Sequence, residues 1–422
     1  MTTQRRASGV RMAAALLLAS LPLSTGCDLD VVNPGPVQDD FLNESGAWPA
    51  ILQGVKRAHA YAFTRLALDN AMIVQEAMPG GLFDTQFTQG ILTSDNSNEN
   101  WNLPNEARWM AEDGVERLRE NGVEGDAAVV EAELLLHVGF TNRLLGHNHC
   151  ISTIDGGPAG DHAVYFERAE AAFTEALAAA QAIGEAGLVD AARMGRADAR
   201  LNLGDWSGAM QDAEAVDTDA VFQLFYDQIE FDDGNEVAFR QEADPWREWT
   251  VWGTFQEEYY TETGDPRAAW RTNPSDPITM VDNLPFYVSL RFEDRLSPHT
   301  VASGWEMLLV RAEAMLASDP GNIDGAMELI NEVRTRFVSD VTGEALEPWT
   351  AATADEAWTA LKQERRMELY LDGRRLADLR RWAEDGRPGT TPMEDMAGRS
   401  MCFPVGSDEV DTNPNGLPKT TG

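Results

Sequence analysis

The sequence predicts a mostly α-helical protein, built from helices that pack in repeated pairs and interrupted by one loop-rich region. Two observations carry this prediction. Apolar residues recur at helical spacing over most of the chain, whereas residues 218–300 are rich in Pro, Gly and aromatic residues. With 422 residues, 43% of them hydrophobic, and with 12 Trp and 16 Phe, the chain can bury a sizeable core. This composition excludes wholesale disorder, because disordered chains contain few aromatic residues.

The predicted helices follow from apolar residues three and four positions apart. The segment 323–337 shows the pattern well, because its apolar positions form one stripe along a helix. Asn322 or Asp324 can cap the start of this helix. The predicted helices cover residues 47–78, 105–121, 127–145, 163–183, 189–203, 206–216, 302–317, 324–337, 353–371 and 374–384.

Several of these helices begin with an aromatic residue that is followed by small residues one and two turns later. Tyr165 is followed by Ala169, and Trp206 by Ala209 and Ala213. This spacing is typical of tetratricopeptide helix pairs, in which small residues allow close packing. One pair cannot bury its apolar face alone, so neighbouring pairs must stack. We therefore expect a tetratricopeptide-like helical-repeat scaffold, with a plain helical bundle as the alternative.

The loop-rich region, residues 218–300, is predicted to be an insertion with a few short strands. Its short apolar runs at 221–225 and 286–292 are the candidates for these strands. Because the aromatic residues of this region lie among turn-forming residues, we expect it to form the ligand side of the protein.

The N-terminus has the features of an export signal. Three arginines accompany an apolar run over residues 12–23, which is too short to span a bilayer. The following Leu23-Ser24-Thr25-Gly26-Cys27 resembles the lipobox of bacterial lipoproteins, in which the cysteine is lipidated. We expect residues 1–26 to be a signal peptide, Cys27 to carry the lipid anchor, residues 27–42 to be a tether and residues 43–422 to be a single domain. Ordinary signal cleavage that leaves Cys27 free is the alternative.

The chain is strongly acidic. It has 33 Lys and Arg against 70 Asp and Glu, a formal net charge of −37. The signal peptide contains three Arg and no acidic residue, so its removal brings the net charge to −40. Nucleic acid is excluded as a partner, since polyanions are bound by clustered basic residues. Anionic lipid surfaces and anionic glycans are disfavoured for the same reason, and neutral sugars or peptides fit better.

The cysteine and histidine residues predict no metal site, and they leave open whether the protein contains a disulfide. Cys150 and Cys402 can form a disulfide in an exported protein or remain as two buried thiols. His147, His149 and Cys150 are zinc-type ligands, but no second cluster completes a site. The sequence also lacks the motifs of nucleophilic hydrolases and nucleotide-binding loops, so no cofactor is expected.

Segments of the C-terminal part occur in an order that resembles one protein family. They are GWEMLLVRAEA at 304–314, INEVRTR at 330–336 and ERRMELYLDGRRLADLRRW at 364–382, and the tail adds Phe403-Pro404-Val405 and Asn413-Pro414-Asn415. Behind a lipoprotein signal and an Asn33-Pro34 element, this set resembles the SusD/RagB family of nutrient-binding outer-membrane lipoproteins. Asp372 departs from the family, which usually has Glu at this position.

The resemblance implies a surface-exposed outer-membrane lipoprotein with a tetratricopeptide-like scaffold. Such a protein acts as a lid on a TonB-dependent, SusC-like transporter and captures oligosaccharides or peptides without cleaving them. The family motifs also contain the acidic and basic residues of a possible active site. Their spacing is helical, so we expect them to form structural ion pairs. These residues are Glu364, Arg365, Glu368, Arg374, Asp378 and Arg381.

The candidates for ligand contacts are aromatic residues in loops, since sugar CH faces stack on aromatic rings. Trp101 leads because its segment, residues 94–102, reads as a polar loop. The other candidates, from the loop-rich region, are Trp246, Trp249, Trp252 and Tyr259, with Tyr260 and Trp270 following. Burial of these rings beneath long loops is the alternative for each. Trp109 is one of the tryptophans assigned to the core, because it is expected on an apolar helical face.

Three hypotheses of function remain. The favoured one is a lipoprotein that captures a ligand for an outer-membrane transporter. The second is a lipid-anchored helical-repeat scaffold that binds only other proteins. The third is a glycan-cleaving enzyme, which needs two carboxylates about 5–10 Å apart beside a cleft.

Overall fold

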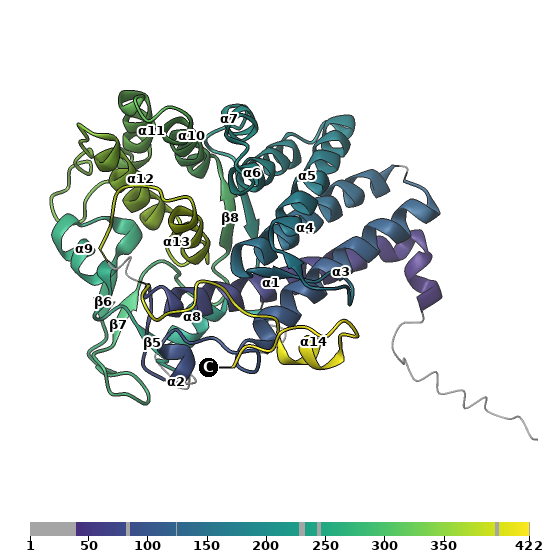
Figure 1. Ribbon diagram of the computed structural model, residues 1–422, viewed down its shortest axis with the longest axis horizontal. Helices are drawn as coiled ribbons and strands as arrows, with labels where there is room; N and C mark the ends of the chain where they lie inside the picture. The colour runs from purple at the N-terminus through teal and green to yellow at the C-terminus, as the bar shows by residue number, and fades with distance from the viewer. Residues whose placement is uncertain are drawn as a thin grey trace, which may run out of the picture. The chain divides into compact units, whose positions relative to one another are not determined.

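Consecutive helices pack side by side along most of the computed structural model (Figure 1). The structure describes residues 39–81, 85–123, 125–227, 233–242, 246–392 and 396–421. The stacked helices are α3 (Asn98–Asn121), α4 (Asp126–Asn148), α5 (Ala163–Ile183), α6 (Ala186–Asn202), α7 (Trp206–Glu214), α10 (Gly304–Ser318), α11 (Ile323–Thr335) and α12 (Ala354–Glu368). The predicted mostly α fold with helical repeats is confirmed.

Close packing within this stack depends on glycines that face an aromatic ring. The ring of Phe173 in α5 lies against Gly139 of α4 and Gly195 of α6. A Cβ at position 139 would lie 2.5 Å from this ring, and one at position 195 would lie 2.2 Å from it. Any side chain at either position would therefore push the helices apart.

Helix α1 (Trp48–Ile73) packs against α3 and α4 and also contacts α13 (Arg375–Glu384). It ends five residues before the predicted position, and Gln75 then has a φ of 60°. Helix α12 ends at Glu368, three residues before the predicted position. Leu371 and Gly373, with φ of 63° and 67°, make the turn that leads into α13.

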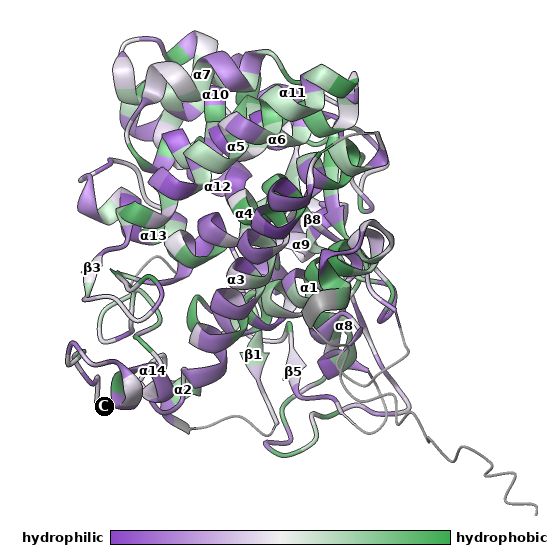
Figure 2. Cartoon of the chain, turned by 90° about the vertical axis from the view of Figure 1, so that its right-hand side faces the viewer, coloured by the Kyte–Doolittle hydropathy of each residue, from purple (hydrophilic) through white to green (hydrophobic). Residues whose placement is uncertain are grey.

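The core lies between these helices in two main clusters. The larger one joins α1 to the helices from α3 to α7, and the smaller one joins α10, α11 and α12. Helix α3 contributes few apolar residues, and Figure 2 shows it as largely hydrophilic. The chain leaves the stack after α7 and returns at α10, which packs against α7, so the loop-rich region is an insertion.

Short antiparallel strand pairs organise the insertion and its neighbours. The two predicted strands are confirmed as β4 (Val221–Leu224) and β7 (Tyr287–Ser289). They pair with two strands that were not predicted: β4 with β8 (His299–Ser303), and β7 with β6 (Trp270–Thr272). The other pairs are β1 (Met78–Pro79) with β5 (Trp249–Thr250), and β2 (Ile151–Ser152) with β3 (Gly160–Asp161).

The insertion also contains two helices that the sequence analysis missed, α8 (Glu236–Gln241) and α9 (Phe255–Thr263). Both are short, so neither displays the several turns of apolar spacing that reveal a helix. The Asn235 side chain caps α8 by accepting the backbone N–H of Ala238. The remaining short elements are η1 (Asp39–Asn43), η2 (Ser45–Ala47), α2 (Thr85–Thr88), η4 (Pro266–Ala268) and α14 (Ser407–Thr412).

The segment around Trp101 is helical, and the prediction of a polar loop there is wrong. Helix α3 begins at Asn98 and continues through Pro104. A proline lacks the N–H that would pair with the carbonyl four residues earlier, here that of Asn100. This carbonyl lies 3.2 Å from Nε2 of His149 instead. A long-range contact therefore satisfies the group that proline leaves free.

The C-terminal segment is tied to the end of α4. Cys150 and Cys402 form a disulfide with their Cα atoms 5.7 Å apart. Next to it, the Phe403 N–H donates to the Asn148 carbonyl at 2.7 Å. The disulfide therefore joins points that lie 252 residues apart in the chain.

Residues Leu42–Gly422 form one compact unit. Within the described ranges, no helix has the length and apolarity needed to cross a membrane. The predicted signal peptide and Cys27 lie outside the described residues, so the proposed cleavage and lipidation remain predictions.

Candidate functional site

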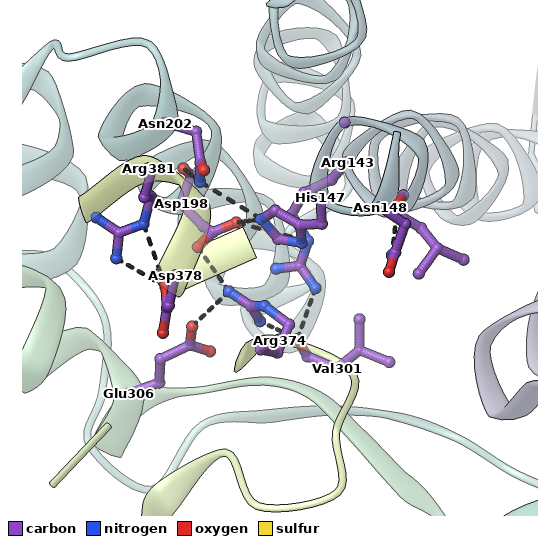
Figure 3. Close-up of polar contacts among 12 residues, drawn as sticks. Arg143, His147, Asn148, Asp198, Asn202, Val301, Glu306, Arg374, Asp378 and Arg381 are labelled. Carbon is purple, nitrogen blue, oxygen red and sulfur yellow. Dashed lines mark hydrogen bonds and ion pairs between the residues drawn. The ribbon is translucent and has the colours of Figure 1, made fainter. Parts of the chain in front are cut away.

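The charged residues of the C-terminal motifs form buried ion pairs between helices. At the start of α13, Arg374 Nη2 donates to Asp198 of α6 at 2.6 Å and to Glu306 of α10 at 2.8 Å (Figure 3). His147 Nε2 lies 2.9 Å from the other carboxylate oxygen of Asp198. Burial alone would raise the pKa of Asp198, but Arg374 and His147 hold it well below its usual range.

A second group of ion pairs surrounds Asp378. Its carboxylate accepts hydrogen bonds from Arg365 at 2.9 Å and from Arg381 at 2.8 Å. Although burial opposes ionisation, these two guanidinium groups hold the pKa of Asp378 well below its usual range. Arg381 also binds Glu313 of α10, which accepts the indole N–H of Trp382 at 2.8 Å.

A third group links the insertion to α12. Arg267 of η4 donates to Glu364 at 2.7 Å and to Glu368 at 3.2 Å. Glu364 also accepts the indole N–H of Trp349 at 2.9 Å. Glu364 is fully buried, and its oxygens are occupied by these partners. The three groups of ion pairs join separate helices, as a structural network does, and leave their carboxylates no access to a ligand.

The leading ligand candidate, Trp101, is a core residue. Only 2% of it is exposed, and it packs against Val405 and Leu417 of the C-terminal segment. Its ring meets that of His149 edge-on, with the centroids 4.8 Å apart. In this conformation Trp101 offers no ring face to a ligand, because the disulfide-linked segment covers it.

Trp249 is also a core residue, with 1% exposed, and its indole N–H donates to the Val237 carbonyl at 3.0 Å. Trp246 is partly buried and packs edge-on against Phe239, with the centroids 5.0 Å apart. Both rings stabilise the packing of α8 against β5.

Tyr259 lies on α9 and is buried, with its hydroxyl accepting a hydrogen bond from Arg334 at 2.8 Å. Burial raises the pKa of Tyr259 to about 12, so the hydroxyl stays protonated. Trp252 is half-buried in the turn between β5 and α9. Of the five predicted residues, four come from one continuous segment, residues 246–259, and only Trp101 lies elsewhere in the chain.

Beside Trp252, three half-buried aromatic residues form a row that we call the aromatic strip: Tyr260 of α9, Trp270 of β6 and Tyr287 of β7. The rings of Trp270 and Tyr287 stack in parallel, with centroids 4.4 Å apart and an interplanar angle of 2°. Tyr260 meets Trp270 edge-on at 6.4 Å. The backbone connects Trp252 to this strip, since the N–H of Val251 donates to the Tyr287 carbonyl at 3.0 Å.

Local structure holds the strip in place. In the antiparallel register Trp270 faces Ser289 and Thr272 faces Tyr287, so the two stacked rings are diagonal neighbours on the hairpin. The Trp270 indole N–H donates to the Glu257 carbonyl of α9 at 3.2 Å. Figure 1 shows α9, β6 and β7 next to one another.

Polar groups surround the strip. The Tyr260 hydroxyl donates to Asp340 at 3.1 Å, and Arg247 forms an ion pair with Asp276 at 2.6 Å. Half-buried Asn273 and exposed Ser275 follow β6. Ring faces bordered by hydroxyl, amide and carboxylate groups can stack on a sugar and bind its hydroxyls. Tyr260 and Trp270 were predicted only as secondary candidates for ligand contacts, and Tyr287 was not predicted.

The prediction that Trp109 is a core residue is wrong. Trp109 of α3 is 55% exposed. The buried side of α3 includes Ala107, Ala111 and Leu118, and position 109 falls off this stripe.

The described part of the chain contains no group of three or more His, Cys, Asp or Glu residues that could hold a metal ion. Cys150 is in the disulfide, and His147 contacts Asp198. His149 lies between the carbonyls of Asn100 and Phe403. His147, His149 and Cys150, the three residues with zinc-binding side chains, are therefore engaged in contacts within the protein.

Together, the stack of helix pairs and the aromatic insertion define a helical-repeat protein of the class represented by SusD. The sequence model of the SusD family matches residues 207–416, which include the insertion and the ion-paired motifs. The chain belongs to the SusD family.

Solved structures share this fold at low sequence identity. A SusD superfamily protein from Bacteroides thetaiotaomicron is 14% identical with a TM-score of 0.66, covering 89% of this chain and 99% of its own. A laminarin-binding SusD-like protein is 13% identical with a TM-score of 0.65, covering 90% and 99%. Surface glycan-binding protein A from Bacteroides uniformis is 15% identical with a TM-score of 0.62, covering 87% and 99%. No curated protein matched the chain.

Proposed function

We propose that this protein captures neutral oligosaccharides at the aromatic strip and does not cleave them. The observation that carries the proposal is the half-buried, parallel stack of Trp270 and Tyr287 on a hairpin with polar surroundings. Such planar rings bind the CH faces of sugars, while neighbouring side chains bind the hydroxyls. Two structures with this fold are named as a laminarin-binding protein and a surface glycan-binding protein, which supports the same chemistry here.

The preference for neutral ligands follows from charge. The chain carries a net charge of −37, which repels a uronate or sulfated glycan. The exposed Arg271 follows Trp270 in β6, so its side chain lies on the opposite face of the hairpin from the stacked rings. Arg247 is already paired with Asp276. Peptides remain a second ligand class in the test below.

We propose binding without cleavage because of the positions of the carboxylates in the C-terminal motifs. The motif acids Glu364 and Asp378 are buried and bound to arginines, so they cannot flank a glycosidic bond. The third hypothesis, a glycan-cleaving enzyme, therefore has no support from these motifs.

The experiment is calorimetric titration with neutral, uronate-containing and peptide ligands, followed by an assay for new reducing ends. Binding of a neutral oligosaccharide without turnover supports the proposal. Turnover of a bound glycan would contradict the binding-only function, and binding restricted to anionic glycans would contradict the charge argument.

Delivery to a transporter is a further part of the proposal. As a family member with a lipobox-like sequence at Cys27, the chain is proposed to be anchored in the outer membrane, facing outward, and to pass its ligand to a SusC-like TonB-dependent transporter. Affinity purification from solubilised membranes tests this, since a large β-barrel protein should copurify. A Cys27→Ser variant should lose membrane attachment.

A protein-binding scaffold is the alternative, and one feature favours it. A groove of about 610 Å³ runs along α3, α4 and α5, with an apolar floor that includes Val115, Leu135 and Val138 and acidic residues at its rim. Copurification of a protein that protects this groove, together with no saccharide binding, would favour the scaffold.

A further inference from the structure

We infer that a cleft between α9 and α12 is a second sugar site, which takes one neutral sugar ring. This inference rests on the proposed glycan binding but concerns a different surface from the aromatic strip. The cleft has a volume of about 450 Å³, within the range of about 300–1,000 Å³ typical of small-ligand sites. Figure 1 shows α9 close to α12, and Tyr259 and Met367 of these helices share one apolar cluster.

Three aromatic residues line this cleft. Phe255 and Tyr259 lie one turn apart on α9 and stack with centroids 5.2 Å apart and an interplanar angle of 28°. Trp349, from the loop before α12, is the third. Tyr260 belongs to the strip and not to the cleft, because consecutive helical residues point about 100° apart. Helix α9 therefore separates two aromatic surfaces.

The cleft also contains a buried polar group without a partner. Gln363 of α12 lines it and is only 5% exposed, and its Nε2 makes no hydrogen bond. A buried amide donor without an acceptor destabilises a folded protein, so such a group is rarely retained without a partner. A ligand oxygen in the cleft would supply the missing acceptor.

Two of the three charged residues that line the cleft, Arg334 and Glu356, already have partners within the protein, and the third, Glu262, is exposed. Arg334 donates to the Tyr259 hydroxyl, stacks on Trp349 at 4.0 Å and lies 3.6 Å from Glu364. Glu356 accepts the backbone N–H groups of Ala352 and Thr353 as part of the helix cap. The cleft therefore offers aromatic rings, one amide donor and the exposed carboxylate of Glu262, which suit an uncharged ring whose hydroxyl groups both accept and donate hydrogen bonds.

The test uses the full chain and two substitutions in the cleft. Gln363→Leu removes the donor without adding bulk, and Thr350→Trp narrows the mouth at an exposed position that leaves the core intact. The matched control is Gln241→Leu in α8, a buried glutamine whose Nε2 also lacks a partner but which does not line the cleft. Each protein is titrated with a neutral monosaccharide and with its tetrasaccharide, and thermal unfolding is recorded.

We expect both cleft variants to lose at least tenfold in affinity for the monosaccharide, while Gln241→Leu stays within twofold. Gln363→Leu should unfold at the same temperature as the parent or higher. If the cleft variants bind the monosaccharide like the parent while Trp270→Ala loses the tetrasaccharide, the second site is refuted and the proposed function stands. If the parent binds no saccharide at all, both the second sugar site and the proposed glycan-binding function are refuted.

Discussion

Arg374, at the start of α13, donates to Asp198 of α6 at 2.6 Å, so a buried ion pair joins residues 176 positions apart. Only 4% of Arg374 and 1% of Asp198 are exposed. The pair therefore fixes the C-terminal motif segment to helix α6 of the stack.

Arg374→Ala should lower the free energy of unfolding by about 3–5 kcal/mol, because it leaves Asp198 and Glu306 buried without their cation. Urea denaturation measures this loss. Arg119→Ala is the control: Arg119 pairs with Glu131 and Glu175 at the surface, where such pairs contribute about 0–1 kcal/mol. Equal losses in the two variants would show that the buried pair has no special role.

Stability should fall in mild acid because of buried histidines. Burial lowers the pKa of His299 to about 3, with Arg291 adding to the effect. A histidine with a folded-state pKa below its unfolded value of about 6.5 stabilises the protein above pH 6.5. This stability is lost as the pH falls, by up to about 1.4 kcal/mol per pH unit.

The variant His299→Gln isolates this effect, since glutamine can still bind the Tyr226 hydroxyl that lies 2.8 Å from Nδ1. Between pH 7 and pH 5 the variant should lose about 2 kcal/mol less stability than the parent. Urea midpoints at the two pH values provide the comparison. Parallel pH profiles would mean that His299 does not titrate as a buried neutral group.

The buried carboxyl group of Glu76 should destabilise the protein at neutral and higher pH, whereas buried His299 destabilises it in acid. Burial raises the pKa of Glu76 to about 7, although Arg375 and Arg366 oppose the shift. For an acid with a raised folded-state pKa, ionisation destabilises the protein increasingly from about pH 4.5 up to pH 7. Glu76→Gln should therefore increase the free energy of unfolding at pH 8 by about 1–3 kcal/mol and change it little at pH 4.5. A gain that is equal at both pH values would refute the assignment.

Loss of the disulfide should loosen the segment that covers Trp101. Cys150→Ser with Cys402→Ser should cost about 2–5 kcal/mol, because the disulfide closes a very long loop. Acrylamide quenching of tryptophan fluorescence should increase in the double variant. Addition of Trp101→Phe should remove most of that increase; if quenching is unchanged, the segment holds its place without the disulfide.

The sequence predicted those features that depend on local pattern. Apolar spacing located the long helices, and Tyr165 and Trp206 with their small neighbours indicated paired helices. The helical spacing of Glu364 and Glu368 indicated ion pairs, but their shared partner Arg267 lies about 100 residues earlier, and no local pattern reveals it.

The candidate site was predicted less well, because exposure depends on distant contacts. Trp101 reads as a loop residue because its neighbours in residues 94–102 are polar, yet helix α3 begins at Asn98 and includes it. Tyr287 was missed because its significance comes from the stack on Trp270, which requires the β6–β7 register.

Calorimetric titration of a neutral oligosaccharide into the parent chain and into Trp270→Ala tests glycan capture by the aromatic strip. The matched control is Trp109→Ala, which removes an exposed tryptophan from α3. We predict that Trp270→Ala weakens binding at least tenfold, or by about 1.4 kcal/mol, whereas Trp109→Ala leaves it unchanged. Undiminished binding by a folded Trp270→Ala protein would contradict the account.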